Sequence, residues 1–296
     1  MSSGKNGKGQ LQSLPAGAAF INDGATDSDI QQGGLGDCWF LSALASLAVD
    51  LPDKFDNTTR KAAAQRVIQK AHNNTAVNEN TKNFKFQFSR LGEWHEVTVD
   101  DVLPEYRRAQ PSHSNEWWVP LTEKAYAQFN QSYDNIEGGY TCWALTELTG
   151  GIAVGMDLTM KKINRIGVEE FKAFVKKYLQ RNGIFCTSND GSDERPEANG
   201  LIQGHAYSLL SIDDIEVNGQ NQTLVRIRNP HGRGEWNGPW SDGSAEWNDV
   251  SEEVKKAIKY SENEDGGFFM SFADWVDQYE TFTVCYITDD KTKTDE

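Results

Sequence analysis

A glycine-rich turn that leads into an apolar, small-residue segment constrains this chain more than any other feature. In the run Gln32–Leu41, Cys38 stands where Trp39–Leu47 begins to read as a buried helix. A cysteine in the first turn of a helix feels the positive end of the helix dipole, which favours the nucleophilic thiolate. Gln32, six residues earlier, carries an amide that can donate to an oxyanion beside the sulfur. The segment predicts two parts of an acyl-transfer site, with a structural cysteine under a helix cap as the alternative.

His205 is the best candidate for the base that a nucleophilic cysteine needs. Gly204 before it allows close backbone approach, and the apolar run Ala206–Ile212 after it is typical of a strand. Asn229 ends the alternating run Leu224–Arg228 and can fix the tautomer of the imidazole. The order cysteine, histidine, asparagine is that of papain-like proteases. A backbone-bonded strand histidine and a turn asparagine before proline are the structural alternatives.

Short runs in family order, from residue 18 to residue 288, resemble the protease core of calpains, the calcium-dependent cytosolic cysteine proteases. The matching runs are Phe20–Thr26, Leu35–Trp39, Glu123–Ala127, Gly204–Ser208, Ile227–Pro230, Glu235–Trp236, Trp240–Asp242 and Glu246–Trp247. The resemblance implies a nucleophile, a base, its orienter and an oxyanion donor, which are Cys38, His205, Asn229 and Gln32 respectively. It also implies that two glycines hold the substrate peptide through their backbone, Gly139 and Gly204.

Calcium is the cofactor that the resemblance implies, and its ligands fall into two clusters. Ca²⁺ takes about six to eight oxygen ligands, from carboxylates and from carbonyls in loops. The implied ligands of the first half are the carbonyls of Asn22 and Gly24 with the carboxylates of Asp29 and Glu116. Those of the second half are Glu235, Asp242, the carbonyl of Asn263, and Asp265. Taken without the resemblance, each acidic residue is typical of a solvent-exposed carboxylate in a loop.

Three positions depart from the family pattern. A carboxylate of the second cluster falls on Gly267 and is absent, with Glu262 or Glu264 as replacements. Its usual partner, an arginine, falls on Asp27, so we expect the link between the two halves to be missing. Fewer carboxylates predict weaker calcium binding by the second cluster, and the missing link predicts little cooperativity. His231 stands where the family has a tryptophan over the histidine–asparagine bond, and we expect it to shield that bond poorly.

Composition agrees with a soluble globular protein. The 296 residues include 25% charged and 38% hydrophobic residues, and the net charge of −15 argues against binding nucleic acid. Four scattered cysteines without metal spacing, and a polar N-terminus without a signal peptide, predict a cytoplasmic protein. No apolar stretch reaches membrane-spanning length. The chain ends where calpains usually continue into regulatory domains, so it is either a naturally short member or part of a longer protein; its oligomeric state is not predicted.

The pattern of elements predicts an α+β, papain-like core of two subdomains with the active site in the cleft between them. We expect a disordered tail over residues 1–17, a helix-rich subdomain over 18–150, a strand-rich subdomain over 151–288 and a polar tail over 289–296. The expected helices are those from Cys38, near Thr58–His72, from Pro120 to Phe129 and near Val168–Gln180. The expected strands are the hairpin around Leu91–Glu93 and the runs Ile184–Thr187, Ala206–Ile212, Leu224–Arg228 and Phe282–Thr288.

These features predict a calcium-dependent cysteine endopeptidase that acts on intracellular proteins. The alternative from another class is a non-catalytic or weakly active calcium-responsive interaction module of the same fold. A transglutaminase-like acyl transferase shares the order of cysteine before histidine and would incorporate amines instead of cleaving peptides. The intact set of candidate catalytic residues favours the endopeptidase.

Overall fold

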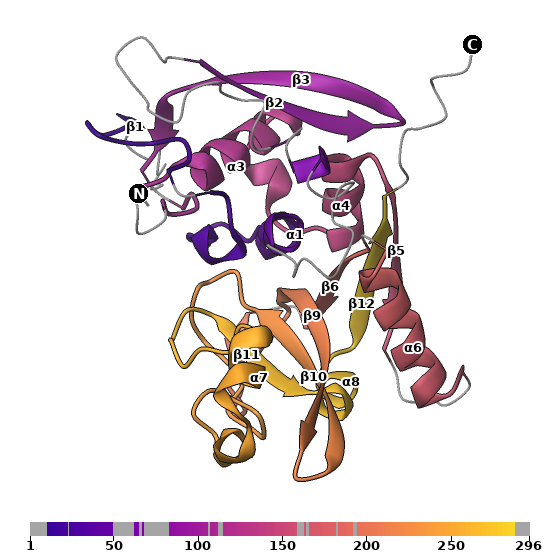
Figure 1. Ribbon diagram of the computed structural model, residues 1–296. Coiled ribbons are helices and arrows are strands. Elements are labelled where there is room, and N and C mark those ends of the chain that lie inside the picture. Colours follow the sequence, from indigo (N-terminus) through magenta and orange to yellow (C-terminus); the bar gives the residue numbers. More distant parts are fainter. Residues whose placement is uncertain are drawn as a thin grey trace, which may run out of the picture.

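The computed structural model describes residues 11–22, 24–49, 62–64, 67, 83–105, 107–111, 115–158, 163, 166–181, 183–191 and 194–287. In the part of the first half that the structure describes, the main elements are the helices α1 (Cys38–Ala48), α3 (Trp118–Phe129) and α4 (Thr141–Thr149) and a hairpin of β2 (Asn83–Arg90) and β3 (Glu93–Asp100) (Figure 1). Shorter elements complete it: β1 (Leu11–Ser13), β4 (Val102–Pro104), and the 3₁₀ turns η1 (Asp27–Asp29) and η3 (Asp134–Ile136).

The second half is organised by one antiparallel sheet of six strands, in the order β11-β10-β9-β6-β12-β5. The strands are β5 (Ile152–Asp157), β6 (Ile184–Ser188), β9 (Ala206–Val217), β10 (Gln220–Arg228), β11 (Gly267–Ser271) and β12 (Thr281–Tyr286). The other elements are α6 (Val168–Leu179), α7 (Glu252–Ala257), α8 (Phe272–Gln278), η4 (Ala245–Asp249), β7 (Arg195–Pro196) and β8 (Ile202–Gln203). A bulge in the β9–β10 ladder falls between Arg226 and Ile227, directly before the end of β10.

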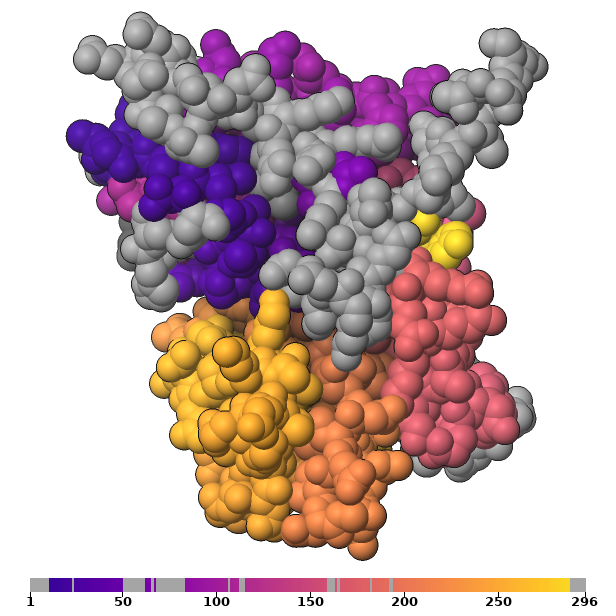
Figure 2. All heavy atoms as spheres, viewed as in Figure 1, coloured from indigo at the N-terminus to yellow at the C-terminus, as the bar shows by residue number. Residues whose placement is uncertain are grey.

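Helix α1 joins the two halves. All of its residues are buried, which explains why its sequence is apolar and small on every face. Two of its polar groups bond to the sheet: the Ser46 hydroxyl donates to the Phe185 carbonyl at 2.7 Å, and the Ser42 carbonyl accepts from the Ser208 hydroxyl at 2.7 Å. The core around α1 therefore continues into the second half through residues of β6, β9 and β12. In the space-filling view, the indigo part of the chain, which includes α1, borders the orange and yellow second half (Figure 2).

The hairpin shows how local pattern sets local structure. Phe84, Phe86 and Phe88 alternate along β2 and are fully buried, while the residues between them face outward. Leu91 and Gly92 both adopt positive φ, as a two-residue hairpin turn of this twist requires. The buried face of the hairpin packs on α3, where Phe88 meets Tyr126 with ring centroids 5.3 Å apart.

Most expected elements are confirmed, with three qualifications. Helix α3 begins at Trp118 rather than at Pro120, which is tolerated because proline fits the first turn of a helix. Leu11–Ser13 pairs with β4, so the prediction of disorder is wrong for this strand, whose backbone finds partners in the ladder. The expected helix near Thr58–His72 lies mostly outside the described residues, as does the tail over 289–296. Among the described residues, no helix is both long and apolar enough to cross a bilayer.

Candidate active site

Cys38, His205 and both predicted substrate-binding glycines line one cleft of about 390 Å³. The cleft lies where the start of α1 faces the start of β9, so its walls come from both halves. Gly139 packs on the Trp39 indole, where an added Cβ would lie 2.4 Å from the ring. Gly204 adopts a φ of 62°, which places His205 at the cleft edge of its strand. The predicted juxtaposition of these four residues is therefore present.

Asn229 fixes one nitrogen of the His205 ring. The Asn229 Oδ1 lies 2.9 Å from His205 Nε2, and the Asn229 amide donates to the Gly234 carbonyl at 2.9 Å. Asn229 is fully buried and its backbone N–H donates to Gly266, so the side chain has little freedom. Because an amide oxygen only accepts, Nε2 carries the proton, and the lone pair of the neutral ring lies on Nδ1.

Glu194, which the sequence did not single out, occupies the other side of that ring. Its Oε1 lies 3.1 Å from His205 Nδ1 and its Oε2 lies 3.5 Å from His231 Nε2. Those contacts hold the pKa of Glu194 well below its usual range. Burial lowers the pKa of His205, while Glu194 opposes that shift. The only sequence signal was an acidic loop residue before the histidine strand, which is ordinarily solvated.

The Cys38 thiol is not activated in this arrangement. Burial raises its pKa to about 12, and the nearby charges of Glu194 and Asp37 add to that shift. Hydrogen bonding to the backbone of Ala206 and Trp39 lowers it less. Burial thus opposes the effect of the helix dipole in this arrangement, and the prediction that the dipole favours the thiolate stays a prediction. A sulfur, a carboxylate oxygen and a ring nitrogen of Cys38, Glu194 and His205 lie within 4.8 Å of one another.

Gln32 is buried but does not face the cleft. Its Nε2 donates to the Leu35 carbonyl at 2.7 Å, within the glycine-rich turn. Its Oε1 has no hydrogen-bond partner among the described residues. The backbone of the turn approaches residue 108 closely at Gly33, where an added Cβ would lie 1.9 Å from the Arg108 carbonyl oxygen. In this arrangement the Gln32 amide N–H group is engaged by Leu35, and Gln32 is not among the residues that line the cleft.

His231 stacks on His205. The two imidazoles are parallel, with an interplanar angle of 3° and centroids 4.5 Å apart. The backbone N–H of His231 donates to Asn229 Oδ1 at 3.0 Å, which holds the turn beside the histidine–asparagine pair. The ring thus covers one face of His205, and its other edge reaches Glu194. How well it shields the His205–Asn229 bond stays a prediction.

The first predicted calcium cluster surrounds η1. Asp29 Oδ2 accepts from the Thr26 N–H at 2.8 Å, the Thr26 hydroxyl at 3.2 Å and the Trp118 indole at 3.1 Å. Glu116 is fully buried, accepts from the Asn22 N–H, and raises the pKa of Asp29 after the larger effect of burial. Gly24 lies between Asn22 and Thr26 with a φ of 113°. The four predicted ligands lie along one short stretch of chain and its neighbour, and protein donors already satisfy the Asp29 oxygen.

The carboxylates of the second predicted cluster accept fewer hydrogen bonds from the protein. Both Asp242 carboxylate oxygens are buried and have no hydrogen-bond partner among the described residues. Burial raises the pKa of Asp242 to about 7, and repulsion from Glu235, Asp265 and Glu262 contributes. Glu235 accepts from the Gly266 N–H at 2.7 Å, and the Asn263 carbonyl accepts from the Asp265 N–H at 2.8 Å. Converging carboxylates with orphaned oxygens fit a hard divalent cation. Glu262 also repels Asp242, so it stays a candidate replacement for the carboxylate missing at Gly267.

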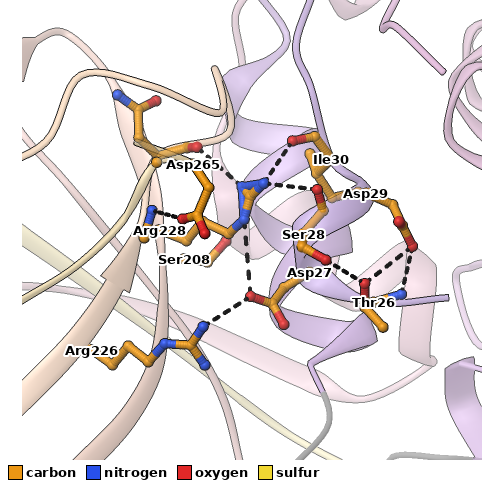
Figure 3. A network of polar contacts seen from close by, with 12 residues as sticks. Thr26, Asp27, Ser28, Asp29, Ile30, Ser208, Arg226, Arg228 and Asp265 are labelled. Atoms are coloured by element: carbon orange, nitrogen blue, oxygen red, sulfur yellow. Dashed lines mark hydrogen bonds and ion pairs between the residues drawn. The ribbon is translucent and has the colours of Figure 1, made fainter. Parts of the chain in front are cut away.

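An ion-pair network links the two clusters, with its charges exchanged relative to the family pattern (Figure 3). Arg228 stands opposite Gly267 in the β10–β11 ladder, and its guanidinium reaches η1. It donates to the carbonyls of Ser28 and Ile30 at 3.1 Å each. Asp27 lies 3.9 Å from Arg228 and 3.7 Å from Arg226.

The family's link between positions 27 and 267 is absent, as the sequence predicts, but a different one through Arg228 joins the halves. The acid now comes from the first half and the bases from the second. The cross-strand register, which places Arg228 beside the vacant carboxylate position, makes this exchange possible.

A cysteine at a helix start that faces a histidine–asparagine pair across a cleft is the arrangement of papain-like cysteine proteases. The family model for the calpain family cysteine protease matches residues 10–286. Calpain-9 of Rattus norvegicus is 38% identical over 279 residues, which is 92% of this chain and 38% of that protein. Calpain clp-4 of Caenorhabditis elegans is 38% identical over 282 residues (92% and 37%), and the calpain-2 catalytic subunit of Homo sapiens is 36% identical over 285 residues (93% and 38%).

The chain belongs to the calpain family of cysteine proteases. It spans less than two fifths of the length of these relatives.

Proposed function

We propose that this chain is the catalytic core of a calcium-dependent cysteine endopeptidase that cleaves proteins in the cytoplasm. The observation that carries the proposal is the cleft in which Cys38 meets a histidine held by Asn229 at 2.9 Å. The division into subdomains over residues 18–150 and 151–288 belongs to the same proposal. It is supported by two hydrophobic cores, one centred on α1 and one on the opposite side of the sheet.

In the proposed mechanism, Cys38 Sγ bonds to the scissile carbonyl carbon while its proton passes to His205 Nδ1. The carbon–nitrogen bond then breaks, and His205 returns that proton to the leaving amine. Water, deprotonated by His205, hydrolyses the resulting thioester and frees the thiol. The Cys38 N–H and the Gln32 amide stabilise the oxyanion, which requires Gln32 to turn from Leu35 toward the cleft. Glu194 must also release His205 Nδ1 before the first step.

The residues that would hold calcium are the two clusters described above. When bound, calcium supplies positive charge to loops of both halves, which favours whichever arrangement of those loops brings the carboxylates together. Arg228 lies between the clusters, because it contacts the Ser28 and Ile30 carbonyls and is attracted by Asp265. A shift of either loop therefore changes the contacts of the other. This is the route by which we propose that cation binding reaches the cleft.

The experiment is cleavage of casein in calcium by the wild-type chain and by Cys38→Ala, together with iodoacetamide labelling. We expect labelling of Cys38 to abolish cleavage and to precede that of Cys186 and Cys285, which are fully buried. Cys142 lines the same cleft and is partly exposed, so its labelling provides the internal comparison. Cleavage that persists in Cys38→Ala would contradict the mechanism.

A second candidate function is a non-catalytic, calcium-responsive interaction module. The contact of Glu194 with His205 Nδ1 and the raised pKa of Cys38 favour it, because together they describe a blocked nucleophile. The two functions differ in what calcium binding does. The module binds the cation and cleaves nothing, whereas the endopeptidase binds it and loses the Glu194 contact.

A further inference from the structure

Three side chains with lone pairs converge beside the cleft that Cys38 and His205 line. Cys38, Glu194 and His205 each present one sulfur, oxygen or nitrogen atom, and these three atoms lie within 4.8 Å of one another. His231 extends the group, since its Nε2 lies 3.5 Å from the second oxygen of Glu194. His205 contributes through Nδ1, because Asn229 occupies Nε2. One loop carboxylate thus bridges two stacked imidazoles beside a thiol.

This group lacks a fixed cation. Among the described residues, the ion-pair partners of Glu194 are His205 and His231, and neither a lysine nor an arginine pairs with it. The Glu194 oxygen and His205 Nδ1 lie 3.1 Å apart, and both are acceptors when the ring is neutral. A shared proton can resolve this contact, and so can a metal ion. Metal–ligand bonds of about 2.0 to 2.3 Å put the ligand atoms of a tetrahedral zinc site roughly 3 to 4 Å apart.

We propose that Cys38, His205 and Glu194 bind a thiophilic divalent cation such as Zn²⁺, with water as the fourth ligand and His231 supporting Glu194 through its second oxygen, and that this cation holds the nucleophile out of action. Binding replaces the Cys38 thiol proton, which passes to solvent, by a sulfur–metal bond. His205 Nδ1 then has no lone pair for catalysis. Metal binding does not depend on the proposed protease function; the inhibition does.

The ligand chemistry separates this site from the two calcium clusters. Calcium requires oxygen ligands, and here a single carboxylate accompanies sulfur and imidazole nitrogen. The second cluster offers carboxylates and a carbonyl without sulfur or imidazole. Zinc and calcium are therefore expected to bind at different places and to act in opposite directions. Glu194 is the accessible member, with 37% of its side chain exposed, so an ion can enter along it.

The binding test uses Cd²⁺ as a spectroscopic substitute for zinc, with the whole chain in calcium-free buffer. We expect an ultraviolet cadmium–thiolate charge-transfer band that saturates at one ion per chain and is absent from Cys38→Ala. Glu194→Gln should raise the concentration needed for half-saturation by at least about tenfold, as loss of a ligand or of its support does. His231→Phe should raise it less. A band that survives Cys38→Ala, or half-saturation unchanged in both Glu194→Gln and His231→Phe, overturns the site.

The functional test measures casein cleavage in calcium as Zn²⁺ is added. We expect wild-type cleavage to be inhibited, and Glu194→Gln to need at least about tenfold more zinc for the same inhibition. Glu253→Gln, which changes an exposed carboxylate on α7, should behave as the wild type. Equal zinc sensitivity of Glu194→Gln and wild type overturns the inhibitory role. If the chain cleaves nothing, the cadmium band still decides the site, so failure of the protease proposal is recognised separately.

Discussion

The two candidate calcium clusters differ in how far the protein satisfies their carboxylates. In the first, Asp29 is held by three donors from Thr26 and Trp118, and Glu116 accepts from a backbone N–H. In the second, both oxygens of Asp242 are buried without a partner among the described residues, and neighbouring acids repel it. An unpaired buried charge is costly, so the second cluster has more to gain from a cation.

This comparison reverses the ranking expected from the sequence. The carboxylate absent at Gly267 suggested that the second half would bind calcium more weakly. However, Glu235, Glu262 and Asp265 all act on Asp242, so the charge at this place is not depleted. In the first half, a cation must compete with hydrogen bonds that are already made. We therefore predict two binding steps, the tighter one in the second half.

The largest expected effect is on the link between the clusters. Arg228→Leu leaves the carbonyls of Ser28 and Ile30 without their donor, so we expect a loss of about 3 kcal/mol in unfolding free energy. Thermal unfolding should then begin roughly 6 to 12 °C lower in a chain of this size. Arg233→Leu, an exposed neighbour on the following turn, should shift the midpoint little. Equal midpoints for the two variants would show that the halves are not joined through Arg228.

The second expected effect is on calcium affinity. Asp242→Ala removes the orphaned carboxylate, and we expect the tighter calorimetric step to weaken by about ten- to a hundredfold, or roughly 1.4 to 2.7 kcal/mol. Asp29→Ala should weaken the looser step. Asp277→Ala, on the surface of α8, is the control. The comparison fails if Asp29→Ala, and not Asp242→Ala, removes the tighter step.

A third effect concerns the unpaired carboxyls of the first half, which lie outside its calcium cluster. Asp37 and Glu123 are fully buried together, and three of their four oxygens have no hydrogen-bond partner among the described residues. Burial and mutual repulsion raise the pKa of Glu123, and burial raises that of Asp37 to about 7. A shared proton satisfies the pair, whereas a cation is expected to satisfy Asp242.

The direction of the pH effect follows from these raised values. A carboxyl whose pKa is raised by folding stabilises the protein fully below its unfolded value, near 4, and loses that contribution as pH rises through about 7. In Glu123→Gln, the side chain beside Asp37 is neutral at every pH, so the buried pair has one proton fewer to lose as pH rises. We expect its thermal midpoint, relative to the wild type, to rise by about 2 to 4 °C between pH 5 and pH 8, or about 1 kcal/mol. A constant difference would show that the pair does not share a proton.

The smallest effect is the coupling between Asp27 and Arg226. Their charged groups are 3.7 Å apart at a partly exposed place, so a double-mutant cycle with Asp27→Ala and Arg226→Ala should give about 0.5 kcal/mol. Chemical unfolding of the four proteins measures it. A coupling of zero would mean that the carbonyl contacts of Arg228 carry the link without help from the ion pair.

Much of the site could be predicted because its residues occupy backbone positions with strong local signatures. Cys38 follows a glycine-rich turn at a helix start, His205 follows Gly204 just before a strand, and Asn229 follows the end of a strand and precedes a proline. The alternating phenylalanines of β2 likewise predict the hairpin. These features depend on neighbours in sequence, so a single chain displays them.

The rest depends on contacts between distant segments. The exchange of Asp27 with Arg228 needs the β10–β11 register, which places Arg228 opposite Gly267. Glu194 blocks His205 from a loop whose composition predicts only solvent exposure. The state of the Cys38 thiol is set by burial, which local pattern does not report. The number of carboxylates in each calcium cluster can be counted from the sequence. Whether their oxygens already accept hydrogen bonds cannot.

The most direct test is the casein cleavage rate across a calcium titration, starting from excess chelator. We propose that the cleft is blocked without calcium, because Glu194 holds His205 Nδ1 and the Cys38 thiol stays protonated. We predict no cleavage in chelator, and activity that rises as calcium occupies the looser of the two sites, the one in the first half. Full activity in excess chelator would contradict it and leave a constitutive protease.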